Sequence, residues 1–152
     1  MKLAEALIKR ADAQRRIEQL RQRLVRSAKA QEGETPPEQP QALIAELDAT
    51  VNELMDLIKR INKTNSLTAL EEGMTLSDAL AHRDTLLLKR SVYNSLVDAA
   101  AAQQVRYSAS EIKSFSTVNV AELQAQMDRL SRQYRELDTR IQESNWNTEL
   151  MD

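Results

Sequence analysis

The feature that most constrains this chain is a heptad pattern of large apolar residues in its last third. They recur at alternating spacings of three and four residues: Val120, Leu123, Met127, Leu130, Tyr134, Leu137 and Ile141. This spacing places all of them on one side of an α-helix. A single amphipathic helix is not stable in water unless that side is covered. The pattern therefore requires a partner helix, from the same chain or from another copy.

Three more segments have helical character. Residues 41–65 carry a second heptad line, which we expect to be covered by a partner helix or by another subunit: Ile44, Leu47, Val51, Leu54, Ile58 and Ile61. Residues 3–31 and 76–104 also read as long amphipathic helices. Asn119, three residues before Glu122, is a typical N-cap for the last helix. The sequence predicts about four long helices.

The segments between these helices have the composition of loops and short strands. EGETPPEQP holds all three prolines of the chain, so we expect a solvated loop over residues 32–40. LTALEEGMTL predicts a small hairpin in the region 66–76. RYSASEIKSFSTVN predicts an extended segment, or a second hairpin, over residues 106–119. The predicted fold is mainly α, an antiparallel bundle of about four long helices with one or two short β-hairpins, in a single domain 1–152.

Composition excludes several kinds of chemistry. The chain has no cysteine, so it has no disulfide, no thiolate nucleophile and no cysteine-bound zinc. Its two glycines cannot supply a phosphate-binding loop, and His82 is its only histidine. We expect no catalysis, no cofactor and no metal. Its longest apolar runs, such as Ala99–Ala102, have four residues and are far shorter than the ~18 residues that span a membrane. The charged start of the chain lacks the apolar core of a signal peptide. We therefore expect a cytoplasmic protein without a membrane partner.

Polar residues interrupt two of the predicted apolar faces. Arg83 and Arg90 lie on the line of seven-residue spacing that joins Leu76 to Val97, and Asn62 and Asn65 lie at the end of the preceding helix. A buried guanidinium needs carboxylates, carbonyl groups or a bound anion around it. One interpretation is polar pairing that fixes the helix register. Another is a pocket in which all four residues bind a small anion, since the guanidinium fork suits a carboxylate or phosphate. A third is simple exposure to solvent, because heptad projections drift over long helices.

Charge is unevenly distributed along the chain. Residues 1–31 hold nine lysines and arginines against three acidic residues, whereas residues 121–152 hold seven acidic residues against four arginines. The basic helix could follow a phosphate backbone, with Lys2, Lys9, Arg16 and Arg23 on one line. The overall pI of 5.6 and the absence of aromatic residues before Tyr93 argue against a nucleic-acid partner. A solvated face, or one paired with an acidic helix, fits the sequence better.

Four stretches carry a resemblance to a known family. They are KLAEALIKRADAQRRIEQLRQRLVR, IKRINKTN with LTALEEGMTLSDALAHRD, RYSASEIKSFSTVNVAEL, and RELDTRIQESNWNTEL. Together they resemble the septicolysin-like proteins of bacteria over almost the whole chain. The resemblance implies a helical, self-associating protein, and the family name suggests a cytolytic toxin.

The function we predict from the sequence is a non-enzymatic, self-assembling helical protein whose partner is a second copy of itself. The alternatives are an anion-binding protein that uses Asn62, Asn65, Arg83 and Arg90, and a nucleic-acid-associated protein that uses the basic first helix. We expect Trp146 to anchor the C-terminal segment against the bundle or against a neighbouring copy.

Overall fold

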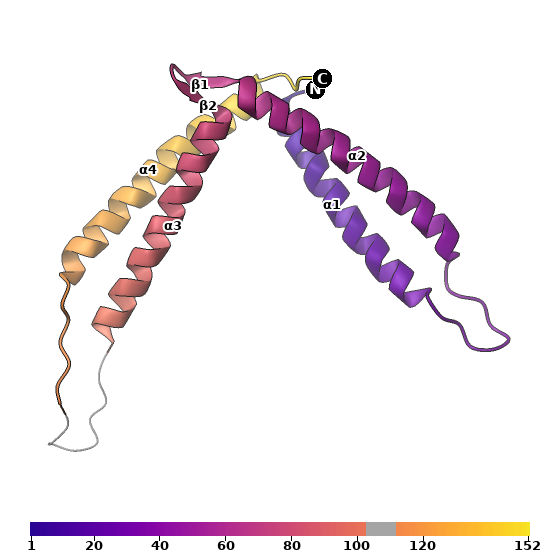
Figure 1. The fold of residues 1–152 in the computed structure, drawn as a ribbon, viewed down its shortest axis with the longest axis horizontal. Coiled ribbons are helices and arrows are strands. Elements are labelled where there is room, and N and C mark those ends of the chain that lie inside the picture. The colour runs from indigo at the N-terminus through magenta and orange to yellow at the C-terminus, as the bar shows by residue number, and fades with distance from the viewer. Residues whose placement is uncertain (103–111) are drawn as a thin grey trace. The chain divides into compact units, whose positions relative to one another are not determined.

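The structure is a computed structural model that describes residues 1–102 and 112–152 (Figure 1). Within these ranges the chain is mainly α, as predicted, with four helices and one two-stranded antiparallel sheet. The elements, in chain order, are α1 (Leu3–Arg26), α2 (Pro40–Leu67), β1 (Ala69–Glu71), β2 (Met74–Thr75), α3 (Leu76–Ala101) and α4 (Val120–Asn147).

Helices α1 and α2 pack against each other as an antiparallel pair. The α1 side of their interface is a line of small and apolar residues seven positions apart: Ala6, Ala13, Leu20 and Ser27, all buried. The α2 side is an equivalent line, also buried: Leu43, Thr50, Leu57 and Thr64. These two lines of seven-residue spacing are the sides on which α1 and α2 cover each other.

At three positions, the line of α2 that packs on α1 lies one residue before the expected apolar line. Ile44, Val51 and Ile58 are exposed, and the buried positions are the residues just before them. The sequence pattern passed over Thr50 because a hydroxyl group is costly to bury without a partner. In the structure its Oγ1 donates to the carbonyl oxygen of Glu46 at 2.8 Å, so the methyl group is free to pack in the seam.

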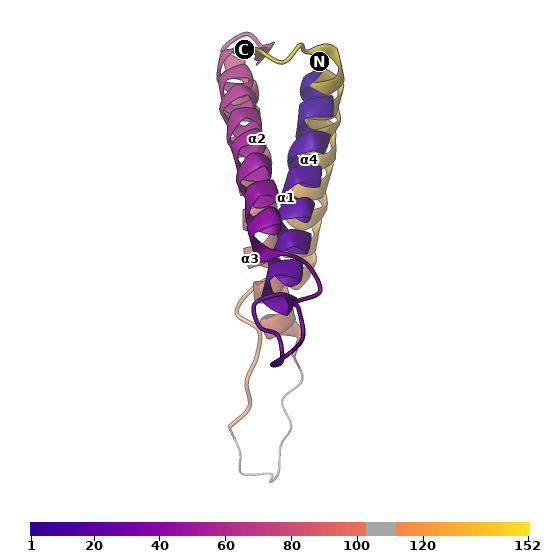
Figure 2. The same ribbon diagram turned by 90° about the vertical axis from the view of Figure 1, so that its right-hand side faces the viewer.

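The connections between the elements lie near their predicted places, although α1 ends at Arg26, so the first loop begins about five residues earlier than predicted. The loop that joins α1 to α2 can be followed in Figure 2, and it ends one residue earlier than predicted because Pro40 begins α2. Proline fits the first turn of a helix, where its missing N–H has no acceptor to lose. The hairpin predicted over 66–76 is β1 with β2, and Gly73 provides the positive φ of 79° in its turn.

Helices α3 and α4 form the second antiparallel pair. The predicted heptad line of α4 lies in this interface, with Met127, Leu130, Leu137 and Ile141 buried. Asn119 is the predicted N-cap, since its Oδ1 accepts the backbone N–H of Glu122 at 3.1 Å. Residues 112–119 form neither helix nor strand in the described part of the chain. The rest of the expected extended segment or second hairpin, residues 106–111, lies outside the described residues.

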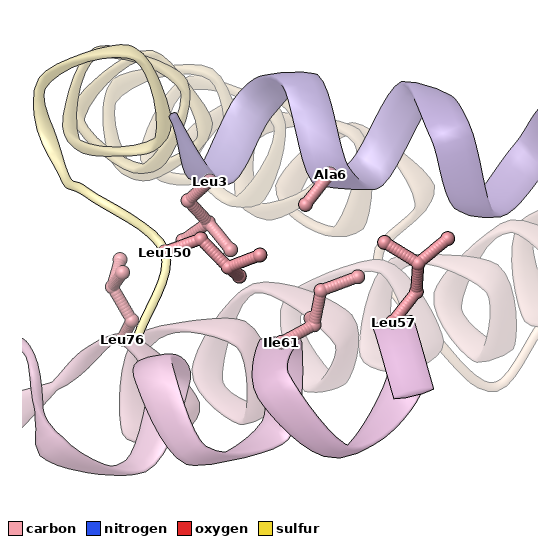
Figure 3. Packing of buried hydrophobic residues seen from close by; sticks show 6 residues of the cluster. All are labelled: Leu3, Ala6, Leu57, Ile61, Leu76 and Leu150. Atoms are coloured by element: carbon pink, nitrogen blue, oxygen red, sulfur yellow. The ribbon is translucent and has the colours of Figure 1, made fainter. Parts of the chain in front are cut away.

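The chain divides into two compact units, Met1–Leu76 with Gln142–Asp152, and Ser77–Ile141. In the first unit, Leu3 and Ala6 of α1 pack with Leu57 and Ile61 of α2, together with Leu76 and Leu150 (Figure 3). Leu150 therefore anchors the C-terminal segment. Trp146, the expected anchor, lies in the last turn of α4 and is exposed, so it does not anchor this segment within the chain, and its packing against a neighbouring copy stays a prediction.

Candidate functional site

Arg83 makes a polar contact between α3 and α4. Its Nη1 donates to Oδ1 of Asp138 at 2.9 Å, and Oδ1 of Asp84 lies 3.4 Å from its Nε. Partial burial alone would lower the pKa of Arg83, but the hydrogen bond to Asp138 and the two carboxylate charges outweigh it. The pKa of Arg83 is therefore raised, and the guanidinium stays charged.

Arg90 lies two helical turns further along the same side of α3. Its Nε donates to Oγ of Ser131 on α4 at 2.7 Å, and its side chain is half-buried. Both arginines thus contact the neighbouring helix, as their seven-residue spacing predicts. The contacts of Arg83 are polar pairing of the kind that fixes the register of two helices.

Asn62 and Asn65 lie near the end of α2, in the first unit, whereas Arg83 and Arg90 belong to the second. Asn62 is exposed and Asn65 is half-buried; the backbone oxygen of Asn62 accepts the hydroxyl of Ser66 at 2.9 Å. A pocket in which these asparagines meet the two arginines around an anion stays a prediction.

Ion pairs neutralise the charge of several arginines on the basic first helix. Arg15 pairs with Asp12 and Arg21 with Glu18 along α1, while Arg23 binds Glu38 of the following loop. The role of this helix in binding nucleic acid stays a prediction. His82 is exposed on α3, and the described residues contain no group of three potential metal ligands.

An exposed apolar line runs along α2, which we call the α2 stripe: Ile44, Val51, Met55 and Ile58. Their exposed fractions are 40%, 45%, 49% and 37%. At 100° per residue, the α2 stripe lies about a quarter of a turn from the line that packs on α1. Sequence reasoning found three of these residues and expected them to be covered by a partner helix or another subunit. The signal that separates the two lines is the pair of buried threonines, Thr50 and Thr64.

A second exposed apolar line runs along α3, which we call the α3 stripe: Leu88, Val92 and Leu96. It lies about half a turn away from Arg83 and Arg90, which contact α4. Helix α3 is therefore apolar on two opposite sides, one of them packed against α4 and the other exposed. Helices that are apolar on both sides are typical of positions between two neighbours.

No described helix is long and apolar enough to cross a membrane. The described fold and its surfaces define a class of helical proteins in which antiparallel helix pairs, with a short hairpin between them, carry exposed apolar stripes. Residues 10–150 match a family of unknown function, DUF6847, and the chain belongs to this family.

One solved structure is closely similar. It is the crystal structure of a functionally unknown conserved protein from Corynebacterium diphtheriae, with 48% sequence identity and a TM-score of 0.93. The match covers 99% of each chain. The comparison with curated proteins finds no match.

Proposed function

We propose that this protein is a non-enzymatic, self-assembling helical protein whose copies associate through the α2 stripe. The observation that carries this proposal is a row of four large apolar side chains, all more than a third exposed, on a helix whose other apolar line is already covered by α1. The row spans 15 residues, or about 21 Å of helix from Ile44 to Ile58. Contiguous exposed apolar surface on a soluble protein is typical of an interaction site.

A second copy is the occupant that best fits the α2 stripe. A pair of helices has one seam, and a stable helical domain ordinarily adds a further layer over the remaining apolar sides. Covering the exposed part of each stripe residue contributes roughly 1 kcal/mol by the usual scale for buried apolar area. The α3 stripe offers a second surface of the same kind, so every copy carries more than one apolar surface for association.

The non-enzymatic part of the proposal rests on composition. A chain with no cysteine, one histidine and two glycines has few groups for nucleophilic or phosphate chemistry. A cytoplasmic location fits the same composition, and the resemblance to septicolysin-like proteins fits a self-associating role.

Light scattering coupled to size exclusion tests this proposal at micromolar concentration. We expect a mass well above the 17.3 kDa of one chain. Val51→Glu places a charge in the α2 stripe and should shift the population toward the monomer. Asn52→Glu is the matched control, because it adds the same charge one residue away, at an exposed position outside the stripe. A monomeric wild-type chain, or equal masses for the two variants, would contradict the proposal.

A further inference from the structure

The second unit contains a groove with an unusual set of side chains. It is about 180 Å³ in volume and lies between α3 and α4; its lining residues are Lys89, Tyr93, Gln126, Arg129, Leu130 and Gln133. Leu130 is buried and forms the apolar floor of the groove. The groove is lined by no acidic side chain of the described chain.

The two cations of the groove come from different helices. Lys89 lies on α3 and Arg129 on α4, and neither makes an ion pair with any residue that the structure describes. The Nζ of Lys89 lies 5.6 Å from the centre of the Tyr93 ring, a cation–π contact. Arg83, in the same pair of helices, has two carboxylate neighbours. The charge of Arg83 is thus compensated within the chain, whereas the charges of Lys89 and Arg129 are not.

The polar groups of the groove are mainly hydrogen-bond donors. The ammonium and guanidinium groups donate only, and the phenol and two carboxamides supply further donors. Two positive charges with several neutral donors suit a tetrahedral oxyanion, to which a guanidinium can donate two parallel hydrogen bonds. The volume accommodates a phosphoryl group.

We infer that this groove binds the phosphoryl group of free phosphate or of a small phosphate monoester. This site is separate from the residues of the predicted Arg/Asn cluster, and it does not depend on association between copies. Lys89 supplies a positive charge, and its ammonium group lies over the Tyr93 ring. Arg129 supplies the bidentate fork. Gln126 and Gln133 donate hydrogen bonds from their side-chain amides.

Isothermal titration calorimetry of the full chain with inorganic phosphate tests the inference, with ionic strength held constant by sodium chloride. We expect saturable binding to the wild-type protein. Lys89→Met and Arg129→Met should each weaken it about tenfold, the usual effect of losing one charge-assisted contact. Lys59→Met on α2 and Arg132→Met on α4 are matched controls, exposed cations outside the groove, and should leave the affinity unchanged.

Gln133→Glu gives an independent test, because it places a negative charge in the groove without shortening the side chain. We expect it to abolish phosphate binding while the helical circular dichroism is retained. A parallel titration with glycerol 3-phosphate identifies the source of the phosphoryl group: tighter binding than inorganic phosphate assigns a monoester, and equal binding assigns the free ion. The inference is wrong if the wild-type protein gives no saturable heat, or if the groove variants bind phosphate as well as the controls do.

Discussion

The hydroxyl group of Thr64 joins α2 to the segment that follows α4. Its Oγ1 donates to the carbonyl oxygen of Arg60 at 2.8 Å and accepts the backbone N–H of Met151 at 2.9 Å. Thr64 is fully buried. The guanidinium of Arg60 reinforces this contact, since its Nε donates to the carbonyl oxygen of Met151 at 3.1 Å.

Thr64→Val should destabilise the protein by about 1–3 kcal/mol, because the N–H of Met151 would lose its acceptor in a part-buried position. Thr50→Val is the matched control. Thr50 is also buried in the α2 seam, but its hydroxyl group bonds only within its own helix, so the loss should stay below about 1 kcal/mol. Urea unfolding followed by circular dichroism measures both, and equal losses would show that the contact with Met151 is not stabilising.

Leu57→Ala and Ile58→Ala test the position of the α2 seam. Leu57 is buried against α1, so its truncation should cost about 2–5 kcal/mol. Ile58 is partly exposed, and its truncation should cost less than about 1.5 kcal/mol. Thermal unfolding at submicromolar concentration measures the two without a contribution from association. A larger loss of stability for Ile58→Ala than for Leu57→Ala would show that the buried line of α2 is the one that contains Ile58.

Removing the Arg83–Asp138 contact should have a moderate effect on stability. Both side chains are partly exposed, so we expect a coupling free energy of about 1 kcal/mol in a double-mutant cycle of Arg83→Ala and Asp138→Ala. The reference is Arg16→Ala, an exposed position on α1, which should cost under about 0.5 kcal/mol. If Arg83 and Arg16 behave alike, the contact between α3 and α4 does not hold their register.

The pairing of Arg23 with Glu38 predicts a dependence of stability on pH. The hydrogen bonds from Arg23 lower the pKa of Glu38 below its ordinary value of 4.5. A carboxyl group whose pKa is lower in the folded protein stabilises the fold above the unfolded pKa, and this contribution is lost as the pH falls through the folded pKa. NMR titration of the carboxyl carbon should show the lowered pKa in the wild-type protein and a return toward 4.5 in Arg23→Gln. An unchanged pKa in that variant would contradict the pairing.

Helix positions and most turns could be predicted from the sequence because they depend on local signals. The heptad line of α4, the cap at Asn119 and the turn at Gly73 are each encoded within a few residues. The α2 seam could not be predicted, because Ile44 and Leu43 are equally apolar and the choice between them depends on which neighbour packs against the helix. Thr50 can occupy the buried line because its hydroxyl group bonds to its own helix. Composition does not reveal this hydrogen bond.

In the candidate sites, too, some residues could be identified from the sequence, while their partners could be found only in the structure. The spacing of Arg83 and Arg90 correctly indicated contact with another helix, but Asp138 and Ser131 became visible as their partners only in the structure. Lys89 and Arg129 were not singled out, because each is an ordinary exposed cation in its own helix. Their common groove arises from the register in which α3 and α4 pair.

The packing of Leu3 against Leu150 has a consequence for how the chain folds during synthesis. Nearly the whole sequence lies between these two residues, so the core cluster of the first unit closes only after the segment around Leu150 has left the ribosome. Helices α1 and α2 are made first but wait longest for their last core residue. Contacts between residues this distant in sequence slow folding, and the incomplete core of a nascent chain exposes apolar surface to other chains. The core of the first unit therefore remains incomplete throughout synthesis until Leu150 emerges.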